Sequence, residues 1–160
     1  TIDPLTGLPN RRYTMNKLKE FKLALTKEQT PFVLILCDVD NFKKVNDEYG
    51  HSFGDEALIH LANILNQHIP NNAVASRWGG EEFLIAIPHV SNAKGEEIAS
   101  KIHAALKQFP VNTSSHSLSL TISMGVVQSR ESDSIDIDIK RADELLYKAK
   151  EQGKNRTCSE

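Results

Sequence analysis

The sequence predicts an α/β (mixed α+β) domain in which a mixed β-sheet is layered with helices. Three observations support this fold class. Apolar runs of strand length alternate with longer amphipathic segments, two adjacent glycines between two short strands indicate a hairpin, and the 160 residues suit a single domain. The predicted order is helix, strand, helix, helix, strand, strand, helix, strand, helix.

The first half of the chain contains a helix, a buried strand and a pair of helices. Residues 9–26 predict a helix with Asn10 as its N-cap, because apolar side chains recur there at helical spacing. Residues 32–39 form a continuous apolar run, which is typical of a strand covered on both faces. A short helix over 41–49 and a longer amphipathic helix over 53–69 follow.

The second half contains the hairpin and two further helices. Its predicted elements are strands over 73–78 and 83–88, a helix over 92–108, a loop over 114–119, a strand over 118–128, a helix over 135–152 and a short strand near 156–158. Gly153 is suited to end the last helix.

Composition excludes several classes of protein. The net charge of -2 gives no indication of bulk nucleic-acid binding, and no apolar run approaches the roughly 18 residues of a membrane span. Because no apolar run is that long, we expect no membrane contact by this domain, and the two cysteines, which make no disulfide framework, favour a reducing cytoplasm. Because the chain starts at Thr1, we expect 1–160 to be one catalytic domain excised from a longer protein. That protein would carry an N-terminal sensory region and could be anchored to a membrane.

Four acidic residues are candidates for a metal site. Asp38 and Asp40 end the buried strand, where carboxylates can bind a hard cation, although acids can also simply terminate a strand. Glu81 and Glu82 lie in the hairpin Gly-Gly-Glu-Glu-Phe and could alternatively be solvated. If the hairpin lies beside the strand, the carboxylates converge and require cations, and two metals would suit an in-line displacement at phosphorus.

Two further pairs are candidates for nucleotide binding. Asn46 and Asp55 flank a glycine-containing turn, and a carboxylate accepts from the N1–H and 2-amino group of guanine but not from adenine. Asp55 could alternatively cap a helix. Lys150 lies in the last turn of the last predicted helix and Lys154 follows that helix, and both could bind phosphates, although cations also stabilise a helix C-terminus. The sequence contains no Walker A motif, no GxGxxG and no HExxH.

Taken together, these segments resemble the GGDEF family over almost the whole chain. The matching segments are DPLTGLPNRR (3–12), DVDNFK (38–43), NDEYGH (46–51), GD (54–55), RWGGEEF (77–83), ADELLYKAK (142–150) and GKNR (153–156). The hairpin is the family variant with Glu at the third motif position. The resemblance implies a palm-like nucleotide-cyclase fold, with a central five-stranded sheet flanked by helices.

The resemblance also implies roles for individual residues. Asp38, Glu81 and the Val39 carbonyl would bind one Mg²⁺ or Mn²⁺, and Glu82 would bind a second. Glu81 or Glu82 would help to deprotonate the attacking 3′-hydroxyl. The residues implied in substrate binding are Asn46 and Asp55 at guanine, the N–H groups of Asn41, Phe42 and Lys43 at the β- and γ-phosphates, and Lys150 and Lys154 at the same phosphates.

The implied activity is that of a diguanylate cyclase, which condenses two GTP molecules into cyclic di-GMP and two pyrophosphates as a homodimer. No product-inhibition site is expected, because Pro70 and Ala73 occupy the positions of the family's Arg-x-x-Asp motif. Lys154 occupies a position where the family often has Arg. Because lysine lacks the bidentate donors of arginine, we expect weaker phosphate binding there. The alternatives are a cyclase that uses ATP, a catalytically silent GTP-binding or cyclic di-GMP-sensing module, and a dimerisation module.

Overall fold

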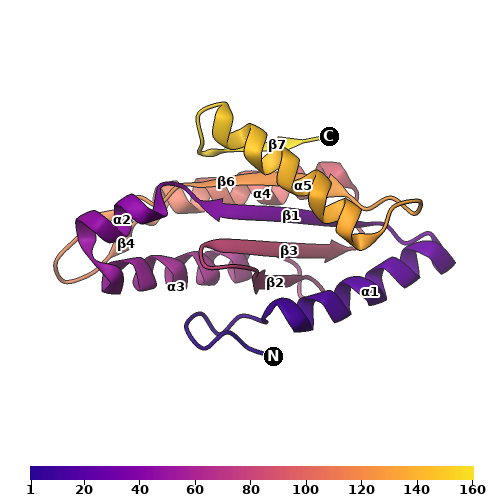
Figure 1. Cartoon of the computed structure of the whole chain (residues 1–160), viewed down its shortest axis with the longest axis horizontal. Helices are drawn as coiled ribbons and strands as arrows, with labels where there is room; N and C mark the ends of the chain where they lie inside the picture. The colour runs from indigo at the N-terminus through magenta and orange to yellow at the C-terminus, as the bar shows by residue number, and fades with distance from the viewer.

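The computed structural model describes all residues 1–160 and contains a five-stranded sheet at its centre (Figure 1). The sheet has the order β2-β3-β1-β6-β7, in which β6 and β7 are parallel and the other neighbours antiparallel. Its strands are β1 (Phe32–Val39), β2 (Val74–Arg77), β3 (Glu82–Pro88), β6 (Ile122–Gln128) and β7 (Arg156–Ser159). This confirms the predicted mixed sheet.

Helices cover both faces of the sheet. Their bounds are α1 (Arg11–Glu28), α2 (Phe42–Tyr49), α3 (His51–His68), α4 (Asn92–Gln108) and α5 (Ile135–Glu151). Helices α1 and α5 pack on one face, and α3 and α4 lie on the other, while α2 extends beyond the end of β1 (Figure 1). Asn10 caps α1 by accepting from the N–H of Tyr13, as the sequence predicts.

Strand β1 lies between the two parts of the hydrophobic core. Val33, Ile35 and Cys37 belong to the larger apolar cluster on the α3–α4 face. Leu34 and Leu36 belong to the smaller cluster on the α1–α5 face. Because successive side chains of a strand point to opposite faces, a strand buried on both sides must be apolar throughout, which explains its unbroken apolar run.

The segment before β6 differs from the prediction. Strand β6 begins at Ile122 rather than at residue 118, and a separate two-stranded sheet, β4 (Val111–Asn112) with β5 (Ser117–Leu118), replaces part of the predicted loop. Two-residue strands are too short to produce a detectable periodicity. The loop between these two strands contacts α2, because the ring of His116 packs edge-on against Tyr49, with ring centroids 5.1 Å apart.

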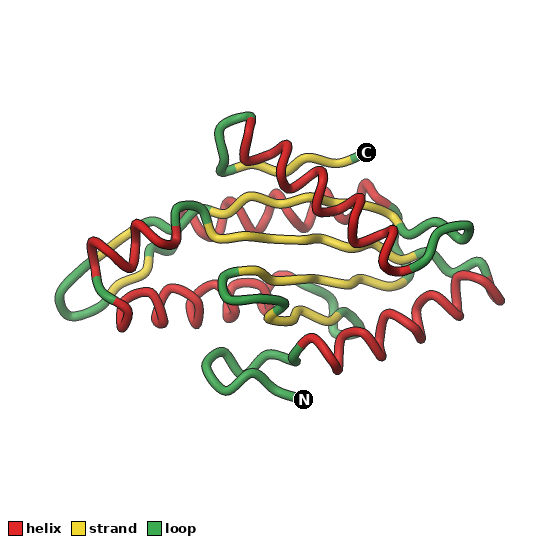
Figure 2. The backbone as a smooth tube through the Cα atoms, viewed as in Figure 1, coloured by secondary structure: helices red, strands yellow, loops and turns green.

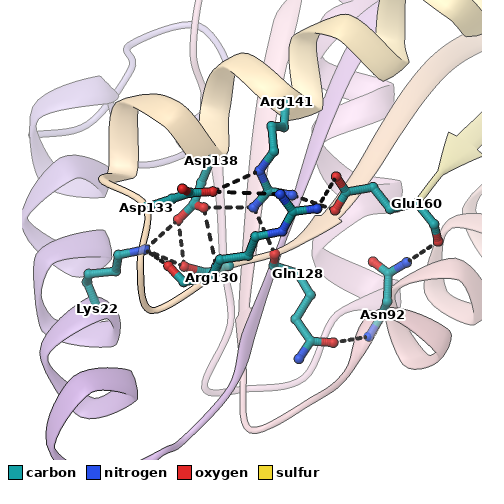
Figure 3. Close-up of polar contacts among 9 residues, drawn as sticks. Lys22, Asn92, Gln128, Arg130, Asp133, Asp138, Arg141 and Glu160 are labelled. Atoms are coloured by element: carbon teal, nitrogen blue, oxygen red, sulfur yellow. Dashed lines mark hydrogen bonds and ion pairs between the residues drawn. The ribbon is translucent and has the colours of Figure 1, made fainter.

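A buried ion network joins α1 to α5 and the end of β6 (Figure 3). The carboxylate of Asp138 is fully buried and accepts hydrogen bonds from Lys22 Nζ at 2.9 Å, Ser129 Oγ at 2.6 Å and Arg141 Nη2 at 2.8 Å. Arg141 also pairs with Glu160 beyond β7. The network therefore fixes one end of α5.

No helix of the domain is long and apolar enough to cross a membrane.

Candidate functional site

A polar cleft of about 200 Å³ lies at the end of the sheet where β1 finishes. Figure 2 shows that the β2–β3 hairpin and the turn after α5 lie at this same end. The cleft is lined by Asp38, Val39, Asp40, Asn41, Phe42, Lys43, Glu81, Lys150 and Lys154. For eight of these nine the family resemblance implies a role in metal or phosphate binding, and the ninth, Asp40, is a metal candidate from its position at the end of the strand.

The two acidic segments meet because β1 and β3 are neighbours. Asp38 lies directly opposite Glu82 in the antiparallel register. Both positions continue the alternation that places Leu36 and Leu84 on the α1–α5 face, so both carboxylates point to that side of the sheet. The N–H of Val39 donates to the carbonyl of Glu81 at 3.2 Å, which ties the hairpin to the end of β1.

Lys150 brings positive charge from α5 to these acids. Its ammonium group donates to Asp38 Oδ2, while Asp38 Oδ1 is buried and has no hydrogen-bond partner. Burial raises the pKa of Glu81 and of Glu82, and the nearby Asp38 carboxylate raises both pKa values further, whereas Lys150 opposes the shift. The negative charge of these acids is therefore only partly neutralised by positive groups of the protein.

The acids are close in the fold but do not form a finished metal site. No group of three or more His, Cys, Asp or Glu side chains is arranged around one point to hold an ion. Glu82 faces the same side as Asp38 but does not line the cleft. The carboxylates of Asp38, Glu81 and Glu82 nevertheless offer oxygen ligands of the kind that a hard cation prefers. One Asp38 oxygen lacks a hydrogen-bond donor, and the pKa values of both glutamates are raised, which indicates that positive charge is lacking there.

The start of α2 forms the opposite wall. Asn41 precedes the helix in a left-handed conformation, with φ of 54°, and its side chain does not cap the first amides. Lys154 Nζ donates to Asn41 Oδ1 at 2.6 Å and so lies beside this helix N-terminus. Uncapped amides and a nearby ammonium group make a suitable environment for phosphate oxygens.

Asn46 and Asp55 do not line this cleft but lie near the junction of α2 and α3. Asp55 is exposed, whereas Asn46 is half-buried against the first turn of α3. A Cβ placed on Gly54 would lie 1.8 Å from Asn46 Oδ1, so only glycine leaves room for this amide. Asn46 thus lies beside Gly54, which directly precedes Asp55, and neither Asn46 nor Asp55 is among the residues that line the cleft.

Asp40 does not share the role considered for Asp38. Its Oδ1 accepts from Ser123 Oγ at 2.6 Å, and its Oδ2 accepts from Thr121 Oγ1 at 2.8 Å and from the N–H of Asn155 at 2.9 Å. Because both oxygens are already occupied by donors, the interpretation of Asp40 as a cation ligand is not supported by its contacts.

Comparisons with known proteins identify the family of the chain. The model of the diguanylate cyclase GGDEF domain matches residues 1–156. The chain belongs to the GGDEF family. It is 42% identical to the uncharacterized protein YhcK of Bacillus subtilis and 39% identical to the diguanylate cyclase VdcA of Vibrio cholerae. These matches cover 98% and 97% of the chain but only 45% of each relative, so the chain spans less than half of their length.

Solved structures of GGDEF domains have the same fold. The GGDEF domain of DgcB from Caulobacter crescentus, in complex with c-di-GMP, aligns with a TM-score of 0.95 at 28% identity. The alignment covers 99% of this chain and 95% of that one. The five-stranded mixed sheet flanked by helices is therefore the fold of this GGDEF domain, as the resemblance implied.

The GGDEF hairpin is braced by residues to which the sequence gave no role. Arg77 donates to the carbonyl of Gly80 at 2.8 Å and to Asp3 Oδ1 at 3.2 Å. The guanidinium group of Arg11 lies 4.3 Å from the centre of the Trp78 ring. Arg77, two residues before the paired glycines, and Asp3, near the start of the chain, were the available signals, but only the fold shows that they meet.

Proposed function

We propose that this GGDEF domain is a diguanylate cyclase that condenses two GTP molecules into cyclic di-GMP and releases two pyrophosphates. The observation that supports the proposal most is the cleft in which Asp38 and Glu81 face Lys150 and Lys154 beside the N-terminus of α2. Carboxylates that can share a cation with phosphates, next to groups that bind phosphates directly, are the parts that phosphoryl transfer requires.

The triphosphate is placed by the α2 side of the cleft. The N–H groups of Asn41, Phe42 and Lys43 would bind the β- and γ-phosphates, since the first amides of a helix have no intrahelical partner. Lys150 and Lys154 would neutralise the same phosphates from the end of α5. Lysine supplies positive charge but lacks the two parallel donors of arginine. A phosphate contact made by Lys154 is therefore less restricted in geometry than one made by the arginine that the family often has there.

The base is recognised at the α2–α3 junction. The exposed carboxylate of Asp55 would accept from the N1–H and the 2-amino group of guanine, and Asn46 would complete the recognition of that edge. Adenine presents an acceptor at N1 and would be repelled, which disfavours ATP as the substrate.

One or two divalent cations, Mg²⁺ or Mn²⁺, fit the acids described above. Asp38, Glu81 and the carbonyl of Val39 would hold one ion, and Glu82 would contribute to a second. The partly buried acids and the free oxygen of Asp38 support this assignment. When bound, the ions would supply positive charge to the phosphate oxygens and to the attacking oxygen.

The protein's own groups then account for the remaining steps. The 3′-oxygen of one GTP attacks the α-phosphorus of the other, and the bond from that phosphorus to the bridging oxygen breaks, so that pyrophosphate leaves with the electron pair. Glu81 or Glu82 accepts the proton of the 3′-hydroxyl as the general base. Two such steps close the ring.

Each domain would hold one GTP, so two domains must face each other in a two-fold arrangement. Activity per domain is therefore expected to rise with domain concentration, since the reacting pair forms only in the dimer. A specific activity that stays constant as the domain is diluted would contradict the dimer requirement.

The test is incubation of the domain at high concentration with GTP and Mg²⁺, followed by chromatography and mass spectrometry of the products. Cyclic di-GMP is expected from the wild type and from the control variant Glu131→Ala, which changes an exposed residue outside the cleft. Glu81→Ala is expected to give none. Absence of product even from a domain fused to a dimerising partner would favour the alternative, a silent GTP-binding or cyclic di-GMP-sensing module.

We also propose that the product does not inhibit this domain through the family's Arg-x-x-Asp position. Pro70 and Ala73 occupy that position in the turn between α3 and β2, and neither side chain offers a charge or a hydrogen bond. Calorimetric titration of cyclic di-GMP into the nucleotide-free domain should show no tight binding, and submicromolar binding would overturn this proposal.

A further inference from the structure

Asp40 has contacts that set it apart from the other acids of the cleft. It follows β1 directly, is only 5% exposed and makes three hydrogen bonds. Two of them come from Thr121 and Ser123, at the start of β6. The third comes from the backbone N–H of Asn155, in the turn that joins α5 to β7. The carboxylate thus links three segments that meet at the end of the sheet.

The turn that Asp40 holds has an unfavourable backbone conformation. Lys154 and Asn155 have φ values of 64° and 49°, in the left-handed region that non-glycine residues rarely adopt. Two consecutive residues of this kind persist only when surrounding contacts impose them. The N–H of Lys154 donates to the carbonyl of Ala149 at 3.0 Å, and the N–H of Asn155 donates to Asp40 at 2.9 Å.

The conformation of this turn decides where the side chain of Lys154 lies. Its ammonium group reaches Asn41 Oδ1, at the entrance of α2, and lines the same cleft as Asp38 and Lys150. Without the bond to Asp40, the turn would lose the contact that fixes Asn155, and the ammonium group would no longer be held beside the α2 amides.

We propose that Asp40 is a positioning residue for nucleotide binding, which acts by holding the Lys154 turn in the conformation that presents its ammonium group to the phosphates. The proposal rests on the proposed function of the cleft as a GTP site. In this proposal Asp40 acts through the turn and not by direct contact with the nucleotide, because it is only 5% exposed and each of its oxygens accepts at least one hydrogen bond from the protein. Its effect must therefore disappear when Lys154 is absent.

Two substitutions separate the hydrogen bonds of Asp40 from its charge. Asp40→Asn can keep an oxygen where Thr121 and Asn155 donate, and its amide can donate to Ser123, whose hydroxyl can also accept. Asp40→Ala removes all three acceptors. If the negative charge mattered, both variants would behave alike, and loss of a carboxylate near the cleft would strengthen the binding of phosphates. If positioning matters, only Asp40→Ala weakens nucleotide binding.

The test measures binding without turnover. The probe is 3′-deoxy-GTP, which lacks the attacking hydroxyl, in the presence of Mg²⁺, and its Kd is measured by calorimetry for the whole domain. We expect Lys154→Ala to raise Kd about 10-fold, in line with loss of a charged hydrogen bond. Asp40→Ala should raise Kd by about as much, and Asp40→Asn should stay within about threefold of the wild type by the argument above.

The decisive result is the double variant. If Asp40 acts through Lys154, the combination of Asp40→Ala with Lys154→Ala raises Kd about 10-fold, whereas independent effects would give about 100-fold. A 100-fold loss, an Asp40→Asn variant as weak as Asp40→Ala, or a wild type that does not bind the probe would each overturn the proposal. Asp136→Ala, at an exposed acid of α5, controls for general charge effects.

Folding and the proposed function are checked separately. Circular dichroism must show a native spectrum for each variant, and Asp40→Ser, which is too short to reach the three donors, replaces Asp40→Ala if the latter does not fold. Production of cyclic di-GMP by the wild type is assayed in parallel. If product forms but the effects of Asp40→Ala and Lys154→Ala on Kd are additive, only the positioning proposal fails. If no product forms but the two effects on Kd are not additive, only the cyclase proposal fails.

Discussion

The ammonium group of Lys150 contacts one carboxylate oxygen of Asp38, and the other oxygen, Oδ1, is buried without a hydrogen-bond donor. Lys150 therefore supplies part of the positive charge that the acids at the ends of β1 and β3 require, but it leaves one acceptor unsatisfied. A divalent cation could satisfy that acceptor, and the lysine would then be free to meet a phosphate group.

This relationship predicts competition between Lys150 and divalent cations. In the nucleotide-free domain, Lys150→Met should increase the affinity for Mn²⁺ severalfold, because the ammonium group no longer neutralises Asp38 and the two glutamates. The expected readout is the midpoint of thermal unfolding as a function of Mn²⁺ concentration. In the same variant, the affinity for 3′-deoxy-GTP should fall about 10-fold, since a charged contact to phosphate is lost.

Two variants make this prediction specific. Lys148→Met changes an exposed lysine of the same helix turn and should leave the Mn²⁺ response unchanged. Asp38→Asn should abolish the response, with or without Lys150. Equal responses of the wild type and Lys150→Met would show that the ammonium group does not compete with the cation.

The contact between Gly54 and Asn46 gives a second prediction. Gly54→Ala would place a methyl group 1.8 Å from Asn46 Oδ1, which cannot be accommodated, so the amide must leave its position. We expect the KM for GTP to rise about 10-fold, as for loss of a hydrogen-bonding group at the base, and the free energy of unfolding to fall by about 1 to 3 kcal/mol.

Removal of the clashing side chain provides the control. Combining Gly54→Ala with Asn46→Ala should restore most of the lost stability, which chemical denaturation measures, but not the KM. If the double variant were as unstable as Gly54→Ala, then the clash would involve Phe42 of α2, whose Cζ lies 3.3 Å from the added methyl position, and not Asn46.

Much of the fold could be predicted from sequence because its signals are local. The unbroken apolar run of β1, the N-cap at Asn10 and the periodicity of α4 each fix an element without knowledge of its neighbours. The ribbon made by β4 and β5 could not be predicted, because two-residue strands carry no periodicity and depend on the packing of His116 against Tyr49.

The sequence motifs could indicate which residues line the cleft, but they could not indicate the tertiary contacts that each residue makes. Asp38 and Asp40 are both aspartates at the end of the same apolar run, so the sequence gives no reason to treat them differently. Only the fold reveals that Asp40 meets donors from β6 and from the turn at Asn155, while one oxygen of Asp38 meets none. In the same way, Arg77 and Asp3 pair although they are 74 residues apart, so the pairing leaves no local signal.

The buried carboxylate of Asp138 predicts a large effect on stability without a direct effect on the site. Asp138→Ala would leave Lys22 and Arg141, whose side chains are mostly buried, without their shared partner. Breaking a buried ion pair from one side costs about 3 to 5 kcal/mol, which urea denaturation can measure. Lys101→Ala, at an exposed pair with Glu97, should leave the unfolding curve unchanged. A similarly small effect of Asp138→Ala would show that the network contributes little.

His103 predicts how stability depends on pH. Burial lowers the pKa of its imidazole below the ordinary value of 6.5, although the charge of Asp40 opposes this shift. The ring nitrogen Nε2 lies 2.9 Å from Thr157 Oγ1, whereas Nδ1 is buried without a partner, so a proton added there would find no acceptor. Glu96 lines the same polar cleft between α4 and β7 and pairs with Ser159 rather than with the histidine.

The sign of the effect follows from proton binding by the two states. Between the lowered pKa and about 6.5, the unfolded chain binds a proton at His103 and the folded domain does not. Unfolding is therefore favoured as the pH falls through this window, and the stability is fully present above it. His103→Gln should reduce the slope of unfolding free energy against pH in this window, while Lys107→Gln, at an exposed position of α4, should not. Urea denaturation at closely spaced pH values measures both slopes, and an unchanged slope in His103→Gln would assign the dependence to another group.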